Sequence, residues 1–125
     1  MGAQDERSRV VRVQLSPEWP NQYPVWITLR DNPDPVDTPV EELSERYGLP
    51  AQLSSEIDEW DREFQAIYRA DDPRESAFPD EATMHRWYAR GRELAERLAA
   101  EFGPAVPVEV VRMGGGYVRV GSDIA

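Results

Sequence analysis

The sequence contains no cysteine, no lysine and a single histidine, His85. Without cysteine, the chain can form neither a disulfide nor a zinc site with thiolate ligands. It also lacks any apolar run approaching the roughly 20 residues that span a membrane, and its polar first ten residues lack the apolar core of a signal peptide. These absences lead us to expect a cytoplasmic protein without a membrane segment.

Positive charge is scarce as well. The 24 aspartates and glutamates outnumber the 14 arginines, which gives a net charge of −10. This sign disfavours nucleic acids and anionic membranes as partners, and it suits a basic partner. The charge is also unevenly placed. Residues 31–81 hold 16 acidic residues and four arginines, whereas the rest of the chain holds eight and ten. The net negative charge therefore comes from the middle of the chain.

The order of the predicted elements indicates an α+β fold. A chain of 125 residues is long enough for a single domain with one core, and we expect residues 1–8 to form a disordered tail. Two strands are predicted near each end of the chain, with three helices between the pairs. We expect one small four-stranded sheet packed against these three central helices. The predicted segments are Val10–Leu15, Val25–Arg30, Thr38–Tyr47, Ser54–Tyr68, Asp80–Phe102, Val106–Arg112 and Tyr117–Val120.

Local signals add detail to this order. Three prolines in residues 31–39 predict a loop. Thr38 is the predicted N-cap of the first helix, with Glu41 completing a capping box. Residues 114–116 are three glycines that predict a hairpin turn. Gly91 lies inside an apolar helical stripe, where glycine is unfavourable by about 1 kcal/mol relative to alanine. We therefore expect another element to approach the helix closely at Gly91.

No group of residues predicts a reaction or a bound cofactor. The carboxylates of Asp58, Glu59, Asp61 and Glu63 have no apolar pocket that would separate their pKa values for acid–base work. Residues Asp31, Asp34 and Asp37 could supply oxygen ligands, but they lack the spacing of a calcium loop. His85 points away from the apolar stripe of its predicted helix. We expect no catalytic residues, no metal and no cofactor.

Carboxylates instead form rows along the predicted helices. Glu56, Glu59 and Glu63 lie within about 60° of one another along one flank, and Glu41 and Glu45 are four residues apart on the preceding helix. Like charges at this spacing are slightly destabilising, and the sequence shows no arginine that would neutralise them. Such rows are either an ordinary solvated helix face or a docking surface for a basic partner.

Aromatic residues in the proline-rich loop after the first strand supply a second candidate surface. Trp19 and Tyr23 have no periodic reason to be buried, and aromatic side chains are frequent anchors at interfaces. We expect them to contribute to partner binding together with the glutamate rows.

Three segments resemble a group of small immunity proteins from high-GC bacteria. The segments are "YPVWI", "YGLPAQLSSEIDEWDREFQAIY" and "DDPRESAFPDEATMHRWYARGRELAERLAAEFGPAVPVEVV", and the resemblance spans about residues 22–112. Such proteins are encoded beside secreted or contact-delivered toxins, many of which are nucleases. The resemblance implies a non-enzymatic immunity protein that occludes the basic active site of a cognate toxin.

Two other functions remain open from the residues alone. A small enzyme or metabolite-binding domain would have its site near the proline-rich loop and would use Trp19, Tyr23 and Trp26. A plain subunit of a larger complex would need no site of its own. The sequence does not distinguish oligomeric states.

Overall fold

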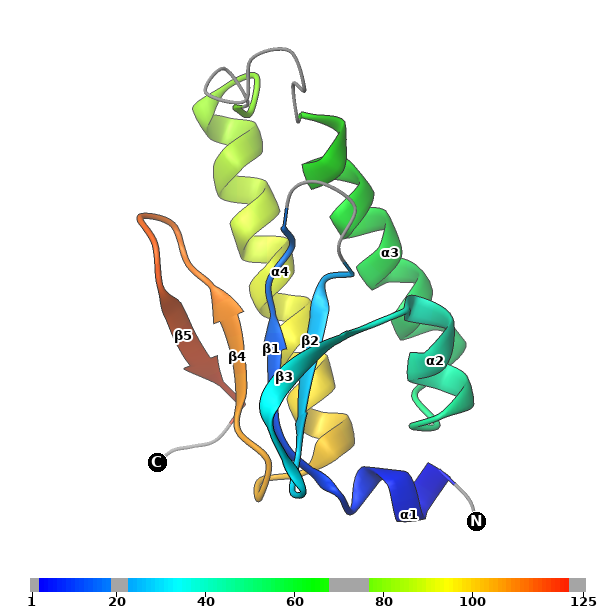
Figure 1. Cartoon of the computed structure of the whole chain (residues 1–125). Helices are drawn as coiled ribbons and strands as arrows, with labels where there is room; N and C mark the ends of the chain where they lie inside the picture. The colour runs from blue at the N-terminus through cyan, green and yellow to red at the C-terminus, as the bar shows by residue number, and fades with distance from the viewer. Residues whose placement is uncertain (1–2, 19–22, 68–76, 122–125) are drawn as a thin grey trace.

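Five strands form one mixed sheet in the computed structural model, which describes residues 3–18, 23–67 and 77–121. The strand order is β3-β2-β1-β4-β5. Strands β1 and β4 are parallel, and every other neighbouring pair is antiparallel. The parallel pair places an early strand and a late strand of the chain side by side in the middle of the sheet (Figure 1). The strands are β1 (Val10–Leu15), β2 (Val25–Leu29), β3 (Asn32–Thr38), β4 (Val108–Val111) and β5 (Tyr117–Val120).

The α+β class is confirmed, but the expected four-stranded sheet has a fifth strand. Strand β3 occupies the segment that its prolines predict to be a loop, and it pairs with β2 through Val36 and Ile27 and through Thr38 and Val25. Because β3 is the edge strand, a proline can lack its N–H donor on the outer side without breaking the ladder. The predicted capping box is also wrong. Thr38 ends β3 and its hydroxyl donates to the carbonyl of Val36 (3.2 Å), so Pro39 precedes the helix without a side-chain cap.

Within the described residues four helices accompany the sheet, where three were expected. The two longer ones, α3 and α4, lie behind the sheet in the view of Figure 1 and cover one of its faces. Asp80 caps α4 by accepting from the backbone N–H of Thr83 at 2.7 Å, which also holds the pKa of Asp80 below its usual value. The helices are α1 (Ala3–Arg7), α2 (Val40–Glu45), α3 (Ala51–Ala66) and α4 (Glu81–Phe102). In the described ranges no helix is long and apolar enough to cross a membrane.

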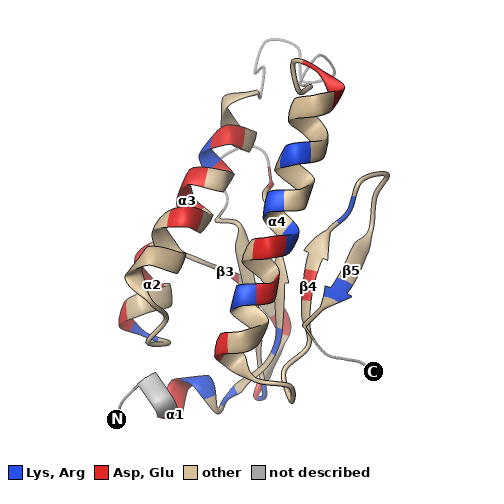
Figure 2. Ribbon diagram, turned by 180° about the vertical axis from the view of Figure 1, so that it is seen from behind, with Lys and Arg blue, Asp and Glu red and all other residues tan. Residues whose placement is uncertain are grey.

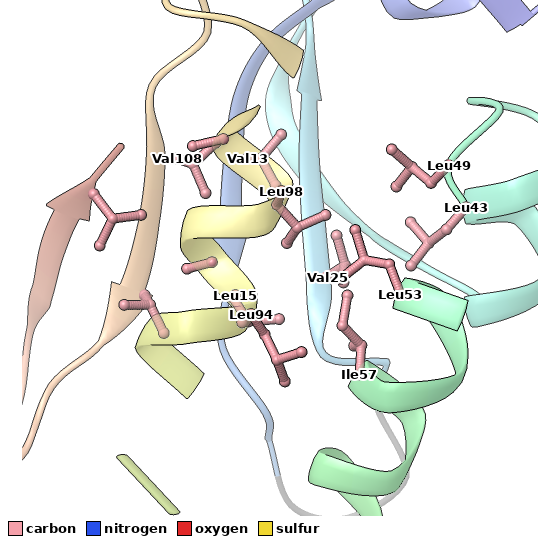
Figure 3. Close-up of a cluster of buried hydrophobic side chains, with 14 of the residues drawn as sticks. Val13, Leu15, Val25, Leu43, Leu49, Leu53, Ile57, Leu94, Leu98 and Val108 are labelled. Atoms are coloured by element: carbon pink, nitrogen blue, oxygen red, sulfur yellow. The ribbon is translucent and has the colours of Figure 1, made fainter. Parts of the chain in front are cut away.

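Buried aliphatic side chains fill the space between the helices and the sheet (Figure 3). They come from one face of β1, β2 and β4 and from the inner faces of α2, α3 and α4. Burial of such side chains is the main driving force for folding. Because these inward positions anchor the helices, their polar residues are left on the outer surface. Fully buried members include Val13, Leu15, Val25, Leu43, Leu53, Ile57, Leu94, Leu98 and Val108.

Two tryptophans join α3 to α4. The indoles of Trp60 and Trp87 stack with centroids 4.2 Å apart, and each indole N–H donates to the backbone carbonyl of the other residue, at 2.8 and 3.0 Å. Both buried donors are thereby satisfied. Gly91 lies against the Trp60 ring, where an added Cβ would overlap Cζ2. The close approach predicted at Gly91 is confirmed, and it explains glycine at this position.

The first residues do not form the expected tail, since Ala3–Arg7 is the short helix α1. Arg7 holds it in place by donating to the carbonyls of Tyr47 (2.6 Å) and Glu101 (2.9 Å). These carbonyls lie just after α2 and at the end of α4, and a helix C-terminus attracts cations. The guanidinium also lies above the ring of Phe102, at 5.8 Å from its centroid. One arginine therefore supplies hydrogen bonds to backbone carbonyls near the ends of two helices that are far apart in the sequence.

Candidate partner-binding surface

Four exposed glutamates occupy the outer sides of α2 and α3. Glu41 and Glu45 belong to α2, and Glu59 and Glu63 belong to α3; we call these four residues the acidic surface. They point outward because the opposite sides of both helices supply buried residues such as Leu43 and Ile57. No ion pair links any of the four to the described part of the chain. Figure 2 shows the concentration of acidic residues along α3.

Elsewhere, arginines neutralise most of the carboxylates that the structure describes. Glu6, for example, binds Arg46 at 3.0 Å, and Glu109 binds Arg12 at 2.7 Å across the sheet. The acidic surface places four carboxylates without such partners on two neighbouring helices. The other carboxylates paired with arginine are Asp31, Glu42, Glu56, Asp58, Glu93, Glu96 and Glu101.

Glu56 does not belong to this unpaired surface, although the sequence places it in one row with Glu59 and Glu63. Its carboxylate accepts from Arg90 and, at 2.9 Å, from Arg97 of α4, while Gln52 donates from one turn earlier at 3.0 Å. Hydrogen bonds from Arg97, Gln52 and Arg90 lower the pKa of Glu56 to about 2. The expectation that no arginine neutralises the row is wrong for Glu56, because α4 supplies two.

A groove of about 340 Å³ separates α2 from α3 beside the acidic surface. Glu41 lies on one side of it and Asp58 on the other, while Ser44 and Ser54 join across it with hydroxyls 3.0 Å apart. Asp58 pairs with Arg62 one turn later in α3 at 2.9 Å, but the Arg62 side chain is 77% exposed. An exposed ion pair of this kind is weak, so a basic side chain that binds Asp58 more tightly can displace Arg62.

The aromatic residues of the proline-rich loop are less informative. Trp19 lies outside the described residues. Tyr23 is 44% exposed, and its backbone N–H donates to Asp37 at 3.4 Å. Trp26 is half-buried and its indole donates to the carbonyl of Ser16 at 2.9 Å. The structure thus leaves Tyr23 accessible, and no described contact joins it to the acidic surface.

Asp31 and Asp61, which were candidates for a metal or acid–base site, each have an individual partner. Asp31 is bound by Arg9 at 2.8 Å, which lowers the pKa of Asp31. Among the described residues there is no cluster of three or more side chains suited to holding a metal ion. Burial raises the pKa of Asp61, but its described hydrogen-bond partner is the amide of Gln65 at 3.2 Å. His85 is exposed, as predicted.

Comparison with known proteins identifies one family. The model of the family described as Serratia CdiI immunity protein-like matches residues 11–112, which is most of the chain. No curated protein gives a significant match.

Proposed function

The chain belongs to the Serratia CdiI immunity protein-like family, whose members are non-enzymatic inhibitors of toxins, and on this premise we propose that it blocks a basic site on its cognate toxin. Family membership implies a CdiA toxin as the partner and removes the enzyme alternative. The proposal adds where the toxin binds and how it is stopped. The acidic surface covers the toxin's basic active site in the cytoplasm, and the toxin is inhibited by occlusion.

The observation that carries this proposal is the distribution of arginine pairing. Of the 14 arginines, those that the structure describes pair with carboxylates on several elements, including Glu42, Glu56 and Asp58 of α2 and α3. Glu41, Glu45, Glu59 and Glu63 of the same two helices form no ion pair within the described residues. Unpaired like charges on one surface repel one another. A basic partner removes this repulsion on binding and gains new ion pairs.

This arrangement also favours fast binding. The field of a charged surface draws an oppositely charged partner into productive encounters and raises the association rate. Nucleases that act on anionic substrates have basic active sites, so an acidic inhibitor competes directly with the substrate. The groove between α2 and α3 offers Glu41 and Asp58 to a long basic side chain of the toxin.

Reversing two charges of the acidic surface tests the proposal. The double variant Glu59→Arg and Glu63→Arg changes exposed positions and spares the core. With the toxin domain encoded beside this gene, we expect association to slow by about ten-fold or more and its salt dependence to flatten. Cells that produce the toxin should lose protection.

A matched control has the same change in net charge. Asp34 of β3 and Glu81 of α4 are exposed and have no ion pair within the described residues. The double variant Asp34→Arg and Glu81→Arg should slow association much less. If both double variants slow association equally, the effect comes from the net charge of the protein and not from the position of the acidic surface. Unchanged binding in a folded Glu59→Arg and Glu63→Arg protein would refute the proposed surface.

A further inference from the structure

A second pocket, opposite in charge to the acidic surface, lies between α4 and the hairpin of β4 and β5. Its volume is about 220 Å³. Arg92 and His85 of α4 and Arg112 of the hairpin contribute its polar side chains, and Tyr88, Val110 and Val118 contribute apolar ones. We call this site the cationic pocket. In a protein with a net charge of −10, a pocket with two arginines and no carboxylate among its lining residues has a distinct electrostatic character.

Arg112 is held ready to bind an anion. Its Nε donates to the carbonyl of Gly115 at 3.0 Å, and the backbone N–H of Arg112 donates to the carbonyl of Gly116 at 3.1 Å. Gly115 has a φ of +106°, in the region that favours glycine. The tight turn therefore fixes the base of the guanidinium. Its two outer nitrogens make no hydrogen bond within the described residues, so they can bind a carboxylate. A pre-positioned arginine fork loses little entropy when it binds.

Arg92 is available as well. It pairs with Glu96 at 3.6 Å on the same helix, and both side chains are more than half exposed. Such a pair is worth little, so a ligand carboxylate in the pocket can replace Glu96. Next to it, Met113 is 40% exposed, and a methionine adapts its shape to an apolar ligand group.

The size of the pocket favours a peptide side chain over a metabolite. Small-molecule sites usually measure about 300–1,000 Å³, and this pocket is smaller. Its volume fits one apolar side chain beside a carboxylate. An acidic residue next to an apolar residue, presented by a protein partner, matches both the charge and the lining.

The position of the pocket indicates which protein supplies that residue. Helix α4 contacts α3 on one side and the β4–β5 hairpin on the other, and all three are visible together from the helical side (Figure 2). A partner that covers the acidic surface can extend across α4 to the pocket. We infer that the cationic pocket is a second anchor for the cognate toxin and binds an acidic, apolar-flanked segment outside the toxin's basic site. This inference rests on the proposed function.

Two opposite patches fix the orientation of a partner better than one. A toxin that presents only a basic surface satisfies α2 and α3 but leaves the pocket empty. A toxin with reversed polarity meets like charges at both places, which weakens its binding. The pocket thereby gives the immunity protein a way to distinguish its own toxin from other basic toxins.

Two single charge reversals on the same hairpin test the inference. Arg112 lies in the pocket, whereas Arg119 of β5 alternates with the lining residue Val118 and points to the other face of the sheet. Both changes, Arg112→Glu and Arg119→Glu, make the protein more acidic by the same amount. Long-range attraction to a basic toxin predicts equal or tighter binding for both.

We expect the two variants to differ in direction. With the toxin domain encoded beside this gene, Arg112→Glu should weaken binding by about ten-fold or more, mainly through faster dissociation, whereas Arg119→Glu should bind within about two-fold of the parent or more tightly. Arg92→Glu should behave like Arg112→Glu, and circular dichroism confirms that each variant is folded. Weaker binding by both pocket variants, with Arg119→Glu unaffected, supports the inference.

Other outcomes overturn it separately from the proposed function. Equal binding by Arg112→Glu and Arg119→Glu refutes the pocket, even if Glu59→Arg and Glu63→Arg weaken binding and so uphold the acidic surface. Sedimentation of the protein alone should show a monomer. A dimer that Arg112→Glu abolishes would show that a second copy of the chain occupies the pocket, which also overturns the inference.

Discussion

Replacing Gly91 with alanine sets two opposing effects against each other. Alanine is favoured over glycine inside a helix by about 1 kcal/mol, so helix propensity alone predicts a more stable protein. The added methyl group, however, would overlap Cζ2 of Trp60 and lie 3.0 Å from its Cε2. That ring cannot move aside easily, because it stacks on Trp87 and donates to its carbonyl. Overpacking of a core costs about 1–3 kcal/mol, and loss of a hydrogen bond adds about 1 kcal/mol.

We therefore expect Gly91→Ala to lower the free energy of unfolding by about 1–3 kcal/mol once the gain in helix propensity is subtracted. Urea denaturation followed by circular dichroism and by tryptophan fluorescence measures this change, provided that the two transitions coincide. A second background isolates the cause. In Trp60→Phe the smaller ring leaves room, so the same alanine should be tolerated much better, and a double-mutant cycle should show the coupling. A more stable Gly91→Ala protein, or an equal penalty in both backgrounds, would refute the steric account.

Two further predictions concern ion pairs. Arg7→Ala should lower the free energy of unfolding by about 1–3 kcal/mol, because it removes a charged donor from carbonyls near the ends of α2 and α4. Arg119→Ala is the control at an exposed position. Equal urea midpoints for the two variants would contradict this role of Arg7. Glu56 has a pKa of about 2 when folded against an ordinary 4.5, so its stabilisation is fully present above pH 4.5 and is lost as the pH falls toward 2. The difference in stability between the parent and Glu56→Gln, measured with urea at pH 6, 4 and 3, should shrink with falling pH, and a constant difference would disprove this linkage.

Local patterns predicted the regular elements well. Strands β1 and β5 have their expected bounds, and the three glycines after Arg112 form the expected hairpin turn. These features depend on neighbouring residues only, which is why periodicity and turn chemistry identify them. Gly91 has low helix propensity but lies inside a helix. This unfavourable placement correctly predicted that another element contacts the helix closely there.

The errors concern features that depend on distant parts of the chain. The prolines of β3 argue against a strand unless that strand lies at an edge, and the strand order is not visible in the sequence. Arg7 appeared to belong to a tail, because the carbonyls that hold it come from residues 47 and 101. The sequence places Arg90 and Arg97 seven residues apart on one side of a helix, but it does not show that this side faces Glu56.

The sequence predicted that the glutamate rows face the solvent, and their role in binding a partner stays a prediction. Glu41, Glu45, Glu59 and Glu63 are exposed and form no ion pair within the described residues. Glu56 leaves their row, because it is bound by arginines of α4. The cationic pocket had no signal in the sequence, because α4 and the hairpin that form it meet only after folding. To predict the pocket, one would have had to know that His85 and Arg112, which are 27 residues apart in the sequence, line the same site.

The parallel pairing of β1 with β4 delays the moment at which a new molecule becomes active. Val13 has no neighbour on that side until Val108, some 95 residues later, has been made. At a synthesis rate of roughly 5–20 residues per second, the ribosome needs about 5–20 s to supply the missing strand. Until then β1 presents an unpaired edge, which is a risk for association with other chains. A cell that begins to make this protein only when a toxin arrives therefore remains unprotected during that interval, so protection depends on molecules that were completed beforehand.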